Sequence, residues 1–140
     1  MIEFGLTFHH LGLAVRKPEQ ALAFVRGMGY SIQPSIFDPL QNVNLILCTH
    51  IEAPAIEIIY RGEGDGPIDP LLARHANGII YHCCYVSRNV ERTLNALTEA
   101  GLRAVCISPS KPAILFGGTK VSFYQIAGMG LIEIIEESAN

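Results

Sequence analysis

The sequence has little of what several specialised classes of protein need. Only 16% of its 140 residues are charged, the net charge is −3, and no basic patch is present, so nucleic acid is not an expected partner. No apolar run approaches the roughly 20 residues of a membrane-spanning helix, and we expect no membrane association. The first residues lack the basic and apolar segments of a signal peptide, which predicts a cytoplasmic protein.

Cysteine is also sparse, and its spacing suits no cross-linking role. The four cysteines form no Cys-x-x-Cys pair, and the adjacent Cys83 and Cys84 would point to opposite faces of a strand. Neither a disulfide framework nor a zinc knuckle fits this pattern. We expect buried free thiols in a reducing compartment. Nearly half of the residues are apolar (49%), enough for the core of one domain spanning 1–140.

What the sequence does contain is a repeat of itself. Five residue pairs share an offset of 72 positions, namely His10 with His82, Arg16 with Arg88, Glu19 with Glu91, Leu22 with Leu94 and Gly29 with Gly101. The tetrapeptide Ile-Glu-Ile-Ile occurs at 56–59 and again at 132–135, an offset of 76. A self-match at a nearly fixed period indicates a duplicated unit. The pseudo-repeats are 1–61 and 78–140, joined by a Gly/Pro-rich linker over 62–77.

Each copy has the periodicity of one strand, one helix and three further strands. In the first copy we expect a strand over 8–15, a helix from Pro18 to about Gly29, and strands near 30–37, 43–49 and 55–60. In the second copy the same elements are expected near 79–87, 89–100, 103–108, 119–126 and 130–136. A short helix is expected within the linker, over 70–76. The predicted fold class is α+β, with two tandem βαβββ modules.

Four polar residues stand at equivalent positions of the two copies. His10 and His82 open the first strand of each copy, and Glu57 and Glu133 lie in the last. Each glutamate is flanked by isoleucines, and burying an isolated carboxylate there costs on the order of several kcal/mol. A divalent ion would offset that cost. Two imidazoles with two carboxylates suit Co²⁺, Ni²⁺, Mn²⁺, Zn²⁺, Fe²⁺ or Mg²⁺.

We therefore predict that these four residues bind one divalent ion and leave two coordination positions for substrate oxygens. Taken singly, each would be read as an ordinary strand residue with its side chain in solvent. Their repetition at equivalent places favours the ligand role. The remaining histidines are weaker candidates, because His9 should point away from His10, while His50 and His75 fall at a strand end and in a loop.

With these residues the chain resembles the vicinal-oxygen-chelate superfamily, which includes glyoxalase I, bleomycin-resistance proteins and extradiol dioxygenases. The opening His10-Leu-Gly-Leu-Ala-Val is similar to the first strand of that superfamily. The segments most similar to methylmalonyl-CoA epimerases are Ser108-Pro-Ser-Lys-Pro, Gly117-Gly-Thr-Lys-Val-Ser-Phe and Gly130-Leu-Ile-Glu. The resemblance implies two modules forming a half-open eight-stranded β-barrel, the same four metal ligands, and a homodimer.

The chain departs from the epimerase pattern at two places. Those epimerases carry a catalytic Glu just before a Gln-Gly-Val turn, whereas here Pro39 or Leu40 stands at that position and Asp38 is the only nearby carboxylate. The usual His-Pro loop before the last strand is replaced by Gln125-Ile-Ala-Gly-Met-Gly. The resemblance therefore transfers the metal site but not the epimerase substrate.

Three functions remain open. The first is metal-assisted proton transfer next to a carbonyl, with Glu133 as the base and Asp38 as a candidate second base. Lys111 and Lys120 would then meet a phosphate or carboxylate of an acyl-CoA-like substrate. Asp38 could instead be a turn residue, and both lysines could be solvated. The second function is a glyoxalase-type lyase on the same ion, and the third is metal-free sequestration of a small molecule.

Overall fold

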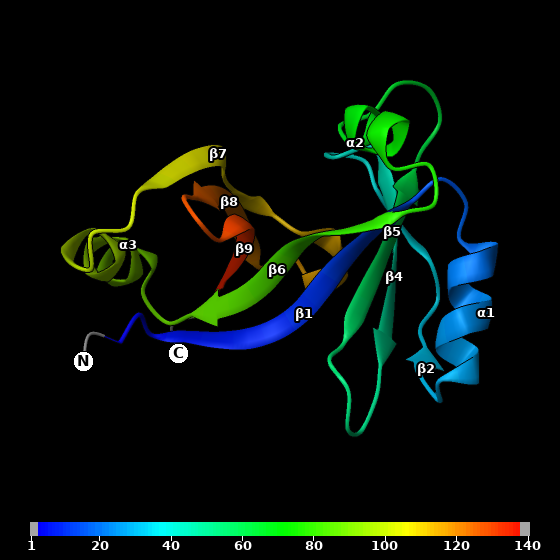
Figure 1. Cartoon of the computed structure of the whole chain (residues 1–140), viewed down its shortest axis with the longest axis horizontal. Coiled ribbons are helices and arrows are strands. Elements are labelled where there is room, and N and C mark those ends of the chain that lie inside the picture. The colour runs from blue at the N-terminus through cyan, green and yellow to red at the C-terminus, as the bar shows by residue number, and fades with distance from the viewer. Residues whose placement is uncertain (1–2, 138–140) are drawn as a thin grey trace. The chain divides into compact units, whose positions relative to one another are not determined.

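The computed structural model describes residues 3–137, and its elements follow the order expected from the repeat (Figure 1). They are β1 (Leu6–Val15), α1 (Glu19–Gly27), β2 (Ser31–Ile32), β3 (Ile36–Asp38), β4 (Val43–Thr49), β5 (Ile56–Arg61), α2 (Asp69–Arg74), β6 (Ile79–Ser87), α3 (Val90–Glu99), β7 (Ala104–Pro112), the 3₁₀ helix η1 (Ile114–Phe116), β8 (Lys120–Ile126) and β9 (Gly130–Glu136). The α+β class and the βαβββ order of each module are confirmed.

The chain divides into two compact units. Unit 1 comprises Met1–His9 and His82–Asn140, and unit 2 comprises His10–Tyr81. The boundaries fall inside β1 and β6, so each of these two strands contributes to both units. The linker over 62–77 belongs to unit 2, where Arg61 and Asp69 form an ion pair at 3.2 Å. That the whole chain is a single domain stays a prediction.

Unit 2 contains a mixed sheet with α1 on one face (Figure 1). β1 is parallel to β5, β4 is antiparallel to β5, and the short strands β2 and β3 both pair with β4. The core under the helix consists of Val15, Val25, Ile46, Cys48 and Ile58, with Leu13, Ala21 and Leu22 packed against it. Because side chains alternate along a strand and Leu13 and Val15 belong to this core, His10, Gly12 and Ala14 lie on the face away from α1.

Unit 1 repeats this arrangement with α3. β6 is parallel to β9, and β8 lies antiparallel between β9 and β7. The face toward α3 is closed by Leu97, Ile126, Ile132 and Ile134. Asn89, directly before α3, is its N-cap residue, and its side chain accepts a hydrogen bond from the Arg92 backbone N–H. The opposite face carries a second cluster of Cys84, Ala113, Val121 and Ile135.

Two strand expectations require correction. The single strand expected near 30–37 is broken into β2 and β3, separated by a segment containing Pro34, which has no N–H to donate to β4. The strand expected to end near residue 108 extends to Pro112 as β7. It does so through two register shifts against β8, one between Cys106 and Ser108 and one between Ser108 and Lys111. A third difference is that Cys106 is exposed and Cys83 only partly buried, although Cys48 and Cys84 are buried as expected.

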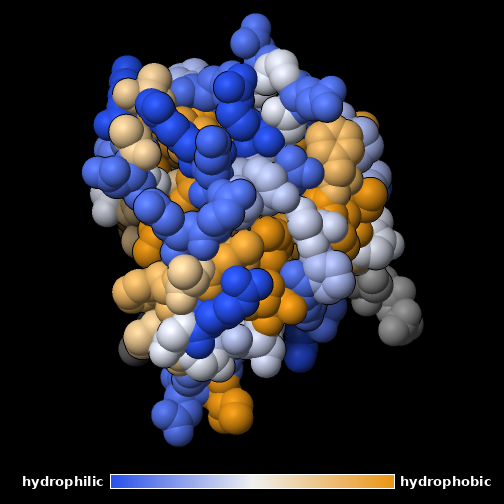
Figure 2. Space-filling view, turned by 90° about the vertical axis from the view of Figure 1, so that its right-hand side faces the viewer, coloured by the Kyte–Doolittle hydropathy of each residue, from blue (hydrophilic) through white to orange (hydrophobic). Residues whose placement is uncertain are grey.

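The side of the molecule seen in Figure 2 carries both apolar and polar side chains. Figure 2, seen from the side of α1, shows hydrophobic surface interrupted by hydrophilic side chains. Exposed large apolar residues of unit 2 include Phe24, Met28, Leu40 and Ile51. Within residues 3–137, no helix is both long enough and apolar enough to cross a membrane.

Gly78, directly before β6, should tolerate no side chain. Its φ is +90°, and a Cβ would lie 3.0 Å from Val15 Cγ1 and 3.2 Å from the Ala14 carbonyl oxygen. Gly64, with φ +74° and no atom near the Cβ position, is the matched control. We expect Gly64→Ala to cost about 1 kcal/mol of unfolding free energy, from backbone strain alone, and Gly78→Ala about 2–3 kcal/mol. Urea denaturation measures both, and equal losses would contradict the packing argument.

Candidate functional site

The first His–Glu pair lies on the face of the unit 2 sheet that points away from α1. His10 is completely buried, and its Nε2 atom is 3.7 Å from Oε2 of Glu57, which is 4% exposed. The pair forms because β1 and β5 are parallel neighbours, with Gly12 opposite Glu57 in the register. A histidine in the first strand of the copy and a glutamate in the last are thereby brought together.

The second pair occupies the corresponding face of unit 1. Nε2 of His82 lies 3.1 Å from Oε1 of Glu133, and both residues are buried. β6 and β9 are again parallel, and Cys84 stands opposite Glu133. The His82 ring packs edge-on against Phe123, with centroids 5.4 Å apart, which fixes the plane of the imidazole.

The two pairs have the same local geometry. In each copy the glutamate lies opposite the residue two positions after the histidine, which is Gly12 in the first copy and Cys84 in the second. In each, both side chains are buried on the face away from the helix. The donor set of each unit is therefore one imidazole nitrogen and one carboxylate, which are ligand types for a borderline divalent ion.

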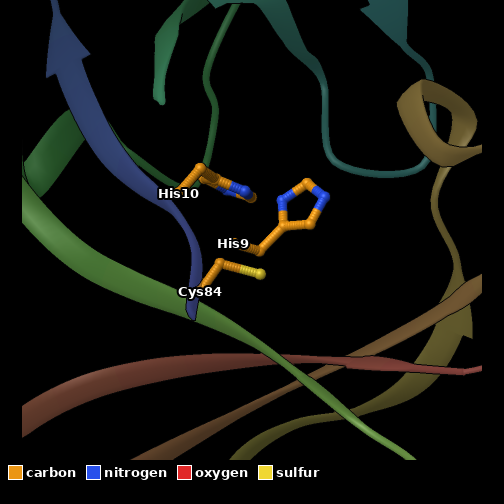
Figure 3. A group of neighbouring side chains, drawn as sticks. All are labelled: His9, His10 and Cys84. Carbon is orange, nitrogen blue, oxygen red and sulfur yellow. The ribbon is translucent and has the colours of Figure 1, made fainter. Parts of the chain in front are cut away.

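His9 and Cys84 form a further group within unit 1, and the expectation that His9 points away from His10 is wrong, because the possible ligand atoms of His9, His10 and Cys84 all lie within 4.8 Å of one another. Figure 3 draws both side chains with that of His10, the next residue along β1, and the His9 ring and the Cys84 thiol lie beside each other. Their potential ligand atoms are within 4.8 Å. The His9 ring also meets Phe116 edge-on, with centroids 5.2 Å apart. The signal for Cys84 was its spacing, since residues two apart in a strand share a face and His82 precedes it by two.

Thiol chemistry at the remaining buried cysteine is suppressed. Burial raises the pKa of the Cys48 thiol, and Arg26 offsets part of that rise. A thiol with a raised pKa is a poor nucleophile and a poor ligand at neutral pH. Cys48 packs among the apolar residues under α1 and has a structural role there.

Asp38 lies on the same face of unit 2 as Glu57 but interacts with its own turn. Its carboxylate accepts hydrogen bonds from the backbone N–H groups of Leu40 (2.9 Å) and Gln41 (3.3 Å) and from the Gln41 side-chain amide (3.1 Å). Asp38 is opposite Val43 of β4, and Glu57 is opposite Leu47 of the same strand. Four residues along a strand place the two carboxylates about 14 Å apart in the strand direction.

The two lysines leave the unit 1 sheet on opposite faces. Lys111 is opposite Val121, which is buried in the cluster on the His82 face, so Lys111 shares that face. Lys120 precedes Val121 in β8, is exposed, and therefore projects from the other face. The structure brings Lys111, and not Lys120, to the face that carries Glu133.

Comparison with known proteins identifies the family. Residues 9–123 match the Glyoxalase/Bleomycin resistance protein/Dioxygenase superfamily, a match that covers most of the chain and ends within β8 of the second copy. The chain belongs to this superfamily. No curated protein sequence matches it.

Similar solved structures share the fold at low sequence identity. A hypothetical protein from Bacillus halodurans C-125 has 20% identity and a TM-score of 0.77, with 96% of each chain covered. Methylmalonyl-CoA epimerase from Mycobacterium tuberculosis has 18% identity and a TM-score of 0.73, covering 96% of this chain and 89% of that one. A methylmalonyl-CoA epimerase in complex with methylmalonyl-CoA and NH₄⁺ has 16% identity, a TM-score of 0.68 and 96% coverage of both. These likenesses show the fold.

Asp38 provides a stability test of its observed contacts. Asp38→Ala removes an acceptor from two backbone N–H groups, and we expect a loss of about 1–3 kcal/mol in unfolding free energy. Asp38→Asn retains a side-chain oxygen for both groups and should cost less than half as much. Thermal denaturation of the two variants measures the difference. Equal losses would show that the negative charge, rather than the acceptor, holds the turn.

Proposed function

We propose that the chain is a divalent-metal-dependent enzyme in which His10, Glu57, His82 and Glu133 bind one ion. The observation that carries this proposal is the repeated pair: each unit buries one imidazole against one carboxylate, at the same register of a parallel strand pair. Membership of the superfamily supports it, because many members of this fold use a metal. The donor set, two nitrogens and two oxygens, fits Co²⁺, Ni²⁺, Mn²⁺, Zn²⁺, Fe²⁺ or Mg²⁺.

The proposed reaction is α-proton transfer next to a carbonyl, similar to that of the epimerases. A divalent ion bound by these ligands would supply Lewis acidity toward substrate oxygens. Glu133 is the proposed base, because a carboxylate on the same face as the bound carbonyl can accept the α-proton. The apolar cluster around Val121 and Ile135 would keep water from the reacting centre on that face. An acyl-CoA thioester is the proposed substrate class, since the similar epimerases act on one.

For a reaction that inverts the α-carbon, Asp38 is the proposed second acid–base group. Its burial on the Glu57 face supports this role, whereas its hydrogen bonds from Leu40 and Gln41 and its position about 14 Å along the strand from Glu57 oppose it. Asp38→Asn, which keeps an acceptor oxygen for the two backbone N–H groups of the turn, separates the two roles when substrate inversion is followed by chiral analysis. A homodimer stays a prediction.

Metal binding is the first consequence to measure. Protein purified without chelating resins should contain about one divalent ion per chain by elemental analysis, and Glu133→Gln should lose it. Glu136→Gln, three residues along β9, is the control and should retain it. Added Co²⁺, Ni²⁺ or Mn²⁺ should stabilise the wild type by about 2.7 kcal/mol at 100 times Kd. Absence of both ion and stabilisation would leave metal-free sequestration of a small molecule as the function.

Proton exchange tests the reaction class. In D₂O the metal-loaded protein should introduce deuterium at the α-carbon of methylmalonyl-CoA, and removal of the ion with EDTA should slow the exchange by a factor of about 100 or more. Mass spectrometry of the thioester measures it. The hemithioacetal of methylglyoxal and glutathione should turn over slowly in parallel assays. Rapid hemithioacetal turnover without exchange in any acyl-CoA would assign the site to a glyoxalase-type lyase.

A further inference from the structure

β7 is the most irregular strand of unit 1, and its irregularities change the face of the sheet from which the following side chains project. Against β8, Cys106 pairs with Tyr124 and Ser108 with Phe123, so one extra residue lies between them in β7. Lys111 pairs with Val121, which places a second extra residue between Ser108 and Lys111. Each extra residue is a β-bulge, and bulges redirect the side chains that follow them.

The second bulge places Ser108 and Lys111 on one face. In a regular strand, residues three apart point to opposite faces. Here both lie opposite residues of the Glu133 face, because Phe123 is the direct partner of both Ser108 and Glu133, and Val121 lies between Lys111 and Ile135. Ser110 within the bulge turns outward, and its hydroxyl donates to Oε1 of Glu136 at 3.3 Å. That contact reaches across β8 from the bulged segment to β9.

The spacing sets what the two side chains could reach. Ser108 and Glu133 occupy one row of the sheet with β8 between them, so their backbones are about 10 Å apart. Lys111 lies in the next row, and its flexible stem carries a cationic head. This separation is too large for contact with oxygens held beside Glu133, and it suits a group at the other end of the same small molecule.

We propose that Ser108 and Lys111 bind an anionic group, a carboxylate or a phosphate, at the distal end of the substrate. The inference rests on the proposed function and deepens it by giving the substrate class a second feature: an oxygen pair near Glu133 and a negative charge toward β7. Lys111 supplies the charge, and the Ser108 hydroxyl donates a hydrogen bond. Lys120 takes no part, because it projects from the opposite face.

A matched pair of ligands tests the proposal without measuring turnover. 2-Oxoglutarate and 2-oxopentanoate have the same 2-oxo acid head and chain length, and they differ in having a carboxylate or a methyl group at the far end. Isothermal titration of the metal-loaded wild type should show 2-oxoglutarate binding roughly tenfold more tightly, the effect of about one charge-assisted hydrogen bond. The ratio of the two affinities cancels changes in the head group's own binding.

Variants identify the residues. Lys111→Met should abolish the preference, Lys111→Arg should retain most of it, and Ser108→Ala should reduce it about two- to fivefold. Lys120→Met, a change of the same charge on the opposite face, should leave it unchanged. Equal affinities for the two acids in the wild type, or equal losses in Lys111→Met and Lys120→Met, would overturn the proposal.

The same variants show which part of the substrate carries the bound anion, and they separate a failure of this proposal from a failure of the proposed function. If Lys111→Met weakens the binding of methylmalonyl-CoA and of methylmalonyl-pantetheine equally, the bound anion is the acyl carboxylate. If it weakens the binding of the CoA ester alone, the bound anion is a phosphate of the nucleotide. If the protein prefers 2-oxoglutarate to 2-oxopentanoate but exchanges no α-proton of an acyl-CoA, the anion site is supported and the proposed reaction is wrong. Protein without a bound ion would overturn the proposed function and this extension together.

Discussion

Burial of a carboxylate on the inner face of a largely apolar strand is the constraint on which the rest of this structure depends. Glu57 and Glu133 are each only 4% exposed, and a charge removed from water must be matched by an opposite charge or be neutralised. In both units the side chain facing the carboxylate is an imidazole from the neighbouring parallel strand, and the proposed divalent ion would supply the opposite charge. Two parallel strands must be joined by a crossover connection. Between β1 and β5 this connection contains α1 and the strands that follow it, and between β6 and β9 it contains α3 and the strands that follow it.

Most of the secondary structure could be predicted from local patterns in the sequence. The periodicity located β1, α1, β6 and α3, and the repeat made the two copies equivalent. The His–Glu pairs depended on more than local pattern, since a residue early in each copy must meet one about 50 positions later. The duplication and the family resemblance supplied that link, because the same residue types recur at equivalent places.

The features that could not be predicted are those that depend on which residues of neighbouring strands pair with each other. β2 and β3 pair with β4 so that Ile32 meets Cys48 and Ile36 meets Leu45, which leaves one extra residue in the interrupted strand. β7 has two such extra residues. Proline at positions 34, 109 and 112 signals irregularity in both strands, but the face of each following side chain depends on which partner it meets. Lys111 and Lys120 were therefore indistinguishable before the pairing was known.

The irregular strand is the same one in both copies, and this bears on how such a duplicated protein can diversify. The ligand pairs share register, burial and residue type, whereas the second strands end differently: Asp38 is held in a turn in the first copy, and Lys111 projects from a bulged strand in the second. An extra residue in a central strand would move a ligand to the other face, but an extra residue in this outer strand moves only residues distant from the ligands. Substrate preference can thus change there while the His–Glu pairs stay intact.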